Sequence, residues 1–262
     1  MTYEPRTYRR TVQPEGLVAF EVSLKETDLQ ILAERDLSSE AADLIAQARW
    51  EIESFIAKHP RFAEALSPYD VPEDSPPLVR QMSAAGAKAR VGPMAAVAGA
   101  IAQYVAMGLA EHSREVIVEN GGDIYLVGEH DRTIALLAGD APVSGKVGVR
   151  VASGLLPVAV CTSSGTVGHS LSFGEADAVT VIARDGALAD AVATALANRV
   201  REPADAQHAV EAARGVLGVL GVLVVVGDTL AAWGNMRLVP LEAEDESGSP
   251  VAEESDEETN EG

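Results

Sequence analysis

The segment from Ala187 to Ala197 constrains the fold most, because it has the length of a helix and is almost entirely apolar. Its residues are Ala, Leu or Val except for Asp190 and Thr194, and Asn198 follows at the same spacing of four. Residues four apart lie above one another on one helical face. A helix that is apolar on its other sides is buried, so we expect this segment at the centre of the core.

The polar side chains of this helix allow two interpretations. The carboxylate of Asp190 and the hydroxyl of Thr194, one turn apart, are two oxygen ligands for a hard cation such as Mg²⁺. Alternatively, they form the narrow polar stripe of a mostly buried helix. Ordinary polar stripes carry long Lys and Glu side chains, whereas this one carries short Asp, Thr and Asn, which favours a site.

The charge of the chain is concentrated at its end. The formal net charge is −20 over 262 residues, and residues 242–262 contain ten Asp and Glu and no Lys or Arg. Subtracting −10 from −20 leaves about −10 on residues 1–241. Binding to nucleic acid is therefore not expected, because no basic stripe is available to release counterions from phosphates. Few aromatic residues, 4% of the chain, imply a core of Ala, Val and Leu.

The sequence contains little that indicates a cellular compartment or a membrane-spanning segment. One cysteine excludes an internal disulfide framework, and the first 16 residues contain no apolar run typical of a secretory signal. Residues 91–110 are apolar but rich in Gly and Ala, and residues 215–226 are too short to span a bilayer as a helix. We expect a cytoplasmic protein that does not bind a membrane.

The order of predicted elements indicates an α+β fold. Strands are expected at residues 17–24, 27–33, 115–127 (two strands around a turn), 134–138, 147–151, 158–161, 178–183, 216–226 and 232–241. Helices are expected at residues 38–58, from Pro77, and at 93–112, 187–200 and 204–214. The two halves have a similar order of strands, helices and strands, which suggests a duplicated unit. We expect one compact domain over residues 1–241 and a disordered acidic tail at 242–262.

Two loops between these elements carry further candidate residues. Asn120-Gly121-Gly122-Asp123 predicts a hairpin turn, and its paired glycines would also let a ligand approach the backbone, with Glu119 or Asp123 at the rim. Thr162-Ser163-Ser164-Gly165-Thr166 could hold an anion through backbone N–H groups and hydroxyls. His169 follows this loop and could contact a phosphate or act as an acid or base. A plain polar loop and a structural histidine are the alternatives.

Four strings in the same order resemble an uncharacterised bacterial and archaeal family within the ApbE-like superfamily. They are GPMAAVAGAIA from Gly92, ENGGDIYL from Glu119, CTSSGTVGHSLSFG from Cys161 and LADAVATALAN from Leu188. The resemblance covers about residues 8–241. It implies an ApbE-like fold of two T-fold-like halves. ApbE itself is a flavin transferase that uses Mg²⁺ and FAD to attach FMN to a Thr or Ser of a target protein.

The resemblance also implies roles for individual residues. Asp190 and Thr194 correspond to the metal pair of ApbE, and a backbone carbonyl ligand would fall near Ala95. The turn residues Gly121, Gly122 and Asp123 would lie at the ligand. The same holds for the Ser-Gly loop, in which His169 would be catalytic together with Asp190. The cofactor-binding residues implied in this way are Gly121, Gly122, Asp123, Ser163, Ser164, Gly165, Thr166 and His169.

Departures from ApbE leave the ligand and the activity open. Gly92 stands where ApbE has an acidic residue, and residues 170–177 are shorter than the matching segment of ApbE. The main hypothesis is Mg²⁺-dependent binding of FAD, another flavin or a related phosphorylated ligand, with FMN transfer. The alternative is a non-catalytic flavin, purine or pterin binding protein of cofactor metabolism. A third hypothesis is a structural role, in which the small-residue helix from Pro93 and the Val-rich strand support a homo-oligomer.

Overall fold

Eight antiparallel strands form the main sheet of this computed structural model, in the order β1-β2-β3-β4-β7-β8-β9-β10. The structure describes residues 16–164 and 174–241, and every structural statement refers to these ranges. The strands of this sheet are β1 (Val18–Leu24), β2 (Thr27–Ala33), β3 (Val116–Asn120), β4 (Asp123–Val127), β7 (Val158–Ser163), β8 (Ala178–Ala183), β9 (Val219–Val226) and β10 (Thr229–Gly234). Three further strands, β5 (Arg132–Ala135), β6 (Val147–Val151) and β11 (Arg237–Pro240), form a second sheet in the order β11-β6-β5.

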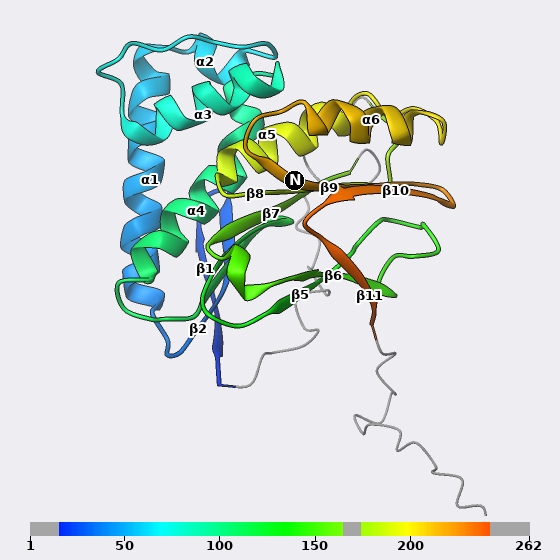
Figure 1. Cartoon of the computed structure of the whole chain (residues 1–262). Helices are drawn as coiled ribbons and strands as arrows, with labels where there is room; N and C mark the ends of the chain where they lie inside the picture. Colours follow the sequence, from blue (N-terminus) through cyan, green and yellow to red (C-terminus); the bar gives the residue numbers. More distant parts are fainter. Residues whose placement is uncertain (1–15, 165–173, 242–262) are drawn as a thin grey trace, which may run out of the picture.

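The main sheet is covered on both faces, by helices on one and by the small sheet on the other (Figure 1). The helices are α1 (Ser38–Lys58), α2 (Arg61–Glu64), α3 (Pro77–Ala89), α4 (Val97–Leu109), α5 (Gly186–Ala197) and α6 (Asp205–Arg214), with short 3₁₀ turns at Pro93–Ala96 (η2) and Ser153–Leu155 (η3). Successive strand residues point to opposite faces. In β3, Val116 and Val118 therefore join the core beneath the helices, whereas Ile117 joins the core against the small sheet.

Two small residues allow the helices α4 and α5 to cross at very short distance. A Cβ atom built on Gly99 of α4 would lie 2.2 Å from the carbonyl oxygen of Gly186, the first residue of α5. The reverse is also true, since a Cβ on Gly186 would lie 2.4 Å from the Gly99 oxygen. The expected burial of α5 follows from this crossing, and 11 of its 12 residues are buried.

Most of the predicted elements are confirmed, and the differences occur at their ends. Residues 232–241 were expected to be one strand, but they divide into β10 and β11, which belong to different sheets. The break falls at Gly234, whose φ of 97° is the left-handed conformation that glycine adopts without strain. The strand expected at 134–138 is centred earlier, at β5, and the helix expected from Pro93 begins as the 3₁₀ turn η2.

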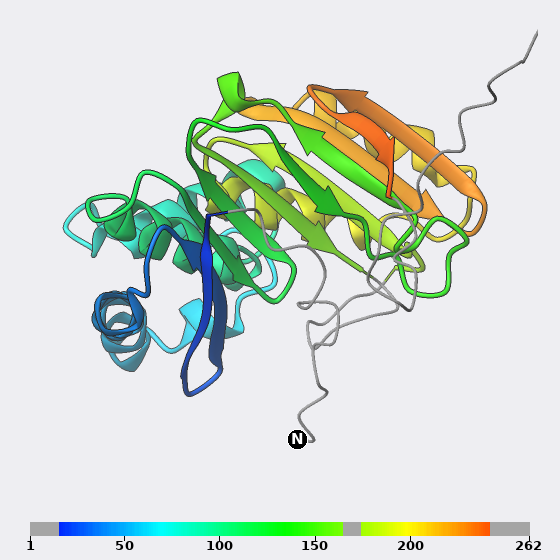
Figure 2. The same ribbon diagram turned by 90° about the horizontal axis from the view of Figure 1, so that it is seen from below.

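Each half of the main sheet has the same sequence of elements. Strands β1 and β2 are followed by helices α1 to α4 and then by β3 and β4, and strands β7 and β8 are followed by α5 and α6 and then by β9 and β10. Seen from below, both groups of four strands continue into one twisted sheet (Figure 2). This order agrees with a duplicated unit, and the T-fold character of each half stays a prediction.

No single helix in the described ranges is both long enough and apolar enough to cross a membrane. Residues Pro77–Ala89 and Pro93–Leu109 reach the required length and composition only as a pair, and they are bent by 104° relative to each other. Their apolar side chains contribute to the core beneath the sheet.

Candidate functional site

The hairpin between β3 and β4 has the two-residue turn that its sequence predicts. Gly121 and Gly122 have φ angles of 67° and 105°, and Asn120 pairs with Asp123 across the turn. Two consecutive residues with positive φ match the right-handed twist of a hairpin, and paired glycines adopt them at no steric cost. The side chain of Glu119 closes the turn, because its Oε1 accepts a hydrogen bond from the Gly122 N–H at 3.0 Å.

This turn places two polar side chains on the helix-covered face of the sheet. Asn120 and Asp123 are directly opposite each other and therefore point to the same face. Asp123 also pairs with Cys161 of β7, and all three side chains are buried. Ser163, two residues after Cys161, continues this face at the end of β7 and is half-buried.

Asp190 reaches the same region from α5. Its Oδ2 accepts a hydrogen bond of 2.9 Å from the backbone N–H of Gly99, in the first turn of α4. The first N–H groups of a helix have no partner within the helix, and the helix dipole favours a negative charge there. Asn120 donates through Nδ2 to the Ala98 carbonyl at 3.1 Å, so α5 and β3 hold the same helical turn.

Two carboxyl groups therefore meet in a buried region at the start of α4. Burial raises the pKa of Asp190 to about 7, although hydrogen bonds from the Gly99 and Ala98 N–H groups act in the opposite direction. Burial, together with the nearby charge of Asp190, raises the pKa of Asp123 well above its ordinary value. Neither carboxyl has a Lys or Arg partner among the residues that the structure describes. Placing both charges in this region without a counterion is costly.

The predicted site residues divide into four sets. Asp123 and Asp190 lie close enough for the charge of Asp190 to raise the pKa of Asp123, and Gly121 and Gly122 form the turn beside Asp123. Thr194 lies half-buried one turn beyond Asp190, and Ala95 lies in η2, which packs against α5. Ser163 and Ser164 lie at the end of β7. Gly165, Thr166 and His169 lie outside the described residues.

Three residues of this region were not assigned a catalytic, cofactor-binding or metal-binding role from the sequence: Gly99, Asn120 and Cys161. A two-residue turn pairs the residues on either side of it, so the Asn-Gly-Gly-Asp string already indicates that Asn120 and Asp123 share a face. Gly99 is different, because nothing in its apolar surroundings indicates that its N–H receives a carboxylate from another helix. Cys161 is buried, and burial and the nearby Asp123 charge raise the pKa of its thiol, so it is held as a neutral group.

A polar network fixes the start of α5 and thereby the position of Asp190. The N-cap residue Asp185 accepts through Oδ1 from the Leu188 N–H at 3.1 Å. Gln103 of α4 accepts through Oε1 from the Gly186 N–H at 2.7 Å. Gln81 of α3 donates through Nε2 to both acceptors, at 2.9 Å to Gln103 and 3.1 Å to Asp185. Three helices are therefore joined at the beginning of the helix that carries Asp190.

Comparison with known proteins assigns the chain to a family. A family-level sequence model described as AbpE bacteria matches residues 9–227. The chain belongs to this family. UPF0280 protein MJ1526 of Methanocaldococcus jannaschii is 42% identical over 221 residues, which are 82% of this chain and 90% of the relative. A UPF0280 protein of Methanocella arvoryzae is 40% identical over 214 residues, which are 81% and 87% of the two chains.

Solved structures show that this AbpE family member has an ApbE-like fold. A mutant of the flavin transferase ApbE from Vibrio cholerae superposes with a TM-score of 0.55 at 14% identity, over 84% of this chain and 97% of that chain. The ApbE protein from Thermotoga maritima superposes with a TM-score of 0.52 at 15% identity, over 82% and 96% of the two chains. The expected α+β, ApbE-like fold is therefore confirmed.

Proposed function

We propose that this chain binds Mg²⁺ at Asp190 and uses it to hold a flavin nucleotide or a related phosphorylated ligand, with FMN transfer as its activity. Two lines support the proposal. The solved structures with the same fold include a protein named as a flavin transferase. The residues that would carry a metal, Asp190, Thr194 and Ala95, lie on two segments that pack against each other, α5 and η2.

The donor set fits Mg²⁺ better than a softer metal. Asp190 offers a carboxylate, Thr194 a hydroxyl and Ala95 a backbone carbonyl, all of them oxygens. An ionised carboxylate has about four acceptor positions, so the hydrogen bonds from Ala98 and Gly99 leave room for a cation. Within the described ranges no group of three or more His, Cys, Asp and Glu could hold a metal alone. Mg²⁺ is typically bound by one or two carboxylates together with substrate phosphates, which suits this sparse set.

The observation that carries the proposal is the meeting of Asp123 and Asp190 in a buried region without a basic partner in the described chain. A bound cation would compensate the Asp190 charge and would neutralise the charge of phosphate oxygens that contact it. The raised pKa of Asp123 favours its protonated form, so that one negative charge rather than two faces an incoming anion. The backbone of Gly121 and Gly122 and the hydroxyls of Ser163 and Ser164 would orient such a ligand.

The variant Asp190→Asn tests the proposal, because an amide oxygen can still accept from the Gly99 N–H while the charge is lost. We expect FAD with Mg²⁺ to raise the melting temperature of the natural protein and to leave Asp190→Asn unchanged. The exposed Asp140→Asn is the matched control and should behave like the natural protein. Equal shifts in all three proteins, or a shift that is unaffected by EDTA, would refute a metal-dependent site at Asp190.

A second candidate function is ligand binding without transfer, and Gly92 favours it. A Cβ atom on Gly92 would lie 1.6 Å from the backbone oxygen of Ala65, so the acidic side chain that ApbE carries at this position has no space here. Incubation with FAD, Mg²⁺ and candidate acceptor proteins separates the two functions. Release of AMP supports transfer, whereas stable binding of intact FAD supports a carrier or sensor.

A further inference from the structure

A groove between α3, α5 and α6 lies on the opposite side of α5 from Asp190. Its volume is about 450 Å³, which is within the range of small-molecule sites. Val192, Leu196 and Arg199 line it. On a helix of 3.6 residues per turn Val192 and Leu196 point away from Asp190 and Thr194, and Arg199 follows the end of α5. The groove is thus separate from the proposed metal site.

The chemistry of the groove is unusual for so acidic a chain. Eleven residues line it: Lys88, Ala89, Arg90, Val192, Ala195, Leu196, Arg199, Ala212, Gly215, Val216 and Leu217. Three of them are basic and, within the described part of the chain, none is acidic. The others are apolar or glycine, and Leu217 leaves 87% of its surface exposed at the edge. The groove therefore combines an apolar floor with a cationic rim.

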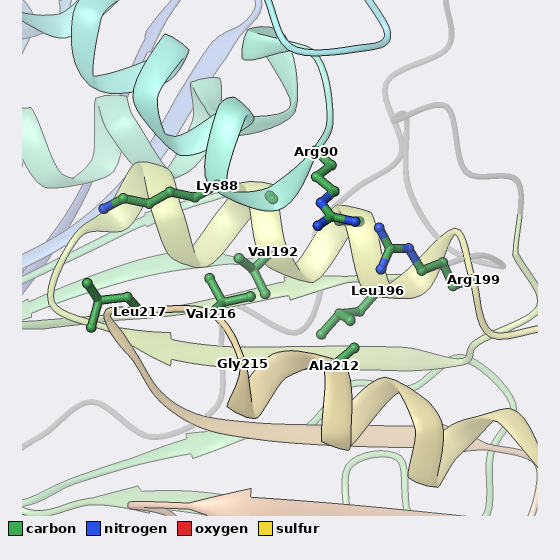
Figure 3. A pocket seen from close by; sticks show the side chains of 11 residues that line it. Lys88, Arg90, Val192, Leu196, Arg199, Ala212, Gly215, Val216 and Leu217 are labelled. Carbon is green, nitrogen blue, oxygen red and sulfur yellow. The ribbon is translucent and has the colours of Figure 1, made fainter.

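Two of the basic side chains converge at one end of the groove, and van der Waals contacts between uncharged groups do not explain this arrangement. Figure 3 shows the guanidinium groups of Arg90 and Arg199 turned toward each other at one end of the groove, with Lys88 and Leu217 at the other end. No carboxylate among the described residues forms an ion pair with Arg90, Arg199 or Lys88. Like charges that approach each other without a counterion repel, and a bound oxyanion would relieve this repulsion.

The backbone at Arg90 adds a second argument. Arg90 is the C-cap of α3 with φ 62° and ψ 40°, the left-handed conformation that commonly favours glycine at this position. A non-glycine residue there carries a backbone cost, and residues in such conformations cluster at functional sites. Attraction between basic residues and a helix C-terminus explains one cation at a helix end. That attraction acts at each helix end separately and does not account for the apolar groove between the two ends.

We propose that this groove binds a small amphipathic oxyanion, with the anionic group held by Arg90 and Arg199 and an apolar body lying on Val192, Leu196 and Val216. Guanidinium groups bind phosphate and carboxylate through paired hydrogen bonds. Both anions share this chemistry, and a phosphate monoester is the better match because its two charges are balanced by two arginines. The site requires no divalent cation.

Calorimetric titration with phenyl phosphate tests the proposal, in EDTA and at constant ionic strength. We expect saturable binding at least tenfold tighter than that of inorganic phosphate, which lacks an apolar body. Phenyl acetate, which lacks the anion, should not bind, and benzoate distinguishes a carboxylate ligand from a phosphate ligand. No saturable binding of either anion, or equal affinity for phenyl phosphate and inorganic phosphate, would overturn the proposal.

Variants locate the binding in the groove. The double variant Arg90→Gly with Arg199→Gln removes both guanidinium groups and keeps a residue that tolerates the left-handed conformation, and we expect at least a tenfold loss of affinity. Ala212→Trp keeps the charges but fills the groove from an exposed position, and it should also abolish binding. Arg237→Gln, on β11, is the matched control. Unchanged affinity in the double variant would refute the site.

The two proposals can fail independently. Asp190→Asn should lose the Mg²⁺-dependent stabilisation by FAD and keep the binding of phenyl phosphate in EDTA. Loss of phenyl phosphate binding in Asp190→Asn would assign this anion to the metal site and overturn the second site.

Discussion

At the scale of single residues, Asp190 combines a structural role with the proposed role of a metal ligand. It stabilises the first turn of α4 through the Gly99 N–H, and it would also hold a cation. The first task needs only an acceptor oxygen, whereas the second needs the ionised carboxylate, and burial strengthens both interactions. The same burial raises the free energy of the charged Asp190 carboxylate when no cation is bound. A buried carboxyl with a raised pKa is more typical of a functional site than of an ordinary helix cap.

The pH dependence of stability follows from this raised pKa. Asp190 titrates near its ordinary value of 3.8 when unfolded and at about 7 when folded. Between these values the folded protein binds more protons than the unfolded chain, so its free energy of unfolding falls as the pH rises from about 4 to about 7. Urea denaturation without divalent cations should show this fall, and Asp190→Asn should flatten it. Asp123 contributes with the same sign, so part of the slope remains.

The exposed variant Asp140→Asn provides the control for this titration. We expect it to keep the full slope of the natural protein, because the side chain that it changes is in contact with solvent. Parallel slopes in Asp190→Asn and Asp140→Asn would show that Asp190 does not gain its proton on folding.

The crossing of α4 and α5 yields a prediction about packing. Gly99→Ala would place a Cβ atom 2.2 Å from the Gly186 oxygen and 2.8 Å from the Asp190 Cβ. The helices must separate, and we expect a loss of about 1–3 kcal/mol in the free energy of unfolding, which is typical of overpacked cores. Denaturant titration measures it. Gly154→Ala, where no atom lies within 4 Å of the added Cβ, is the control and should change stability little.

At the scale of elements, α5 could be predicted almost completely from the sequence, whereas its neighbours could not. Its composition shows that it is buried, and the spacing of Asp190 and Thr194 shows which face is polar. Periodicity, however, describes one helix at a time. It does not indicate that Gly99 and Gly186 bring two backbones together, or that Gln81 and Gln103 converge on the start of α5. Such contacts join residues 22 to 104 positions apart and depend on the packing of the whole helical layer.

The N-cap of α5 gives a test at this scale. Asp185→Ala removes the acceptor of the Leu188 N–H and of Gln81, and we expect a loss of about 1 kcal/mol. Asp185→Asn keeps an acceptor oxygen and should restore most of it. Hydrogen exchange should speed up in the first turn of α5, with a weaker response of the protein to Mg²⁺. Asp43→Ala, at an exposed position in α1, is the control. Unchanged exchange in α5 would refute this role of the cap.

At the scale of the whole molecule, the order of strands and helices was predictable, but the assignment of strands to sheets was not. Local patterns predict strands at residues 134–138, 147–151 and 232–241. They do not show that β5, β6 and β11 leave the main sheet and cover its second face. The same limit applies to the site, since Asp123 and Asp190 meet only when the two halves of the chain form one sheet beneath one helical layer. The resemblance to ApbE supplied that long-range information.

A buried ion pair lies where the chain passes from the main sheet to the small sheet, beside the apolar cluster between them. Glu115, just before β3, accepts hydrogen bonds from the Glu129 N–H at 2.8 Å and from the Arg132 guanidinium at the start of β5. Burial alone would raise the pKa of Glu115, but these hydrogen bonds and that of His130 outweigh it and lower the pKa. The side chains of Glu115 and Arg132 are only 9% and 13% exposed. Removal of either partner therefore leaves a charge with little access to water.

Glu115→Ala should accordingly cost about 3 kcal/mol of the free energy of unfolding, because it leaves Arg132 unpaired. The double variant Glu115→Gln with Arg132→Met should recover most of this loss, since no buried charge remains. The exposed pair of Glu211 and Arg214 is the control, with side chains 53% and 49% exposed, and Glu211→Ala should cost less than about 1 kcal/mol. Denaturant titration of all three variants measures these losses and distinguishes the buried ion pair from the exposed one. Equal losses in Glu115→Ala and Glu211→Ala would mean that the small sheet is held by its apolar contacts alone.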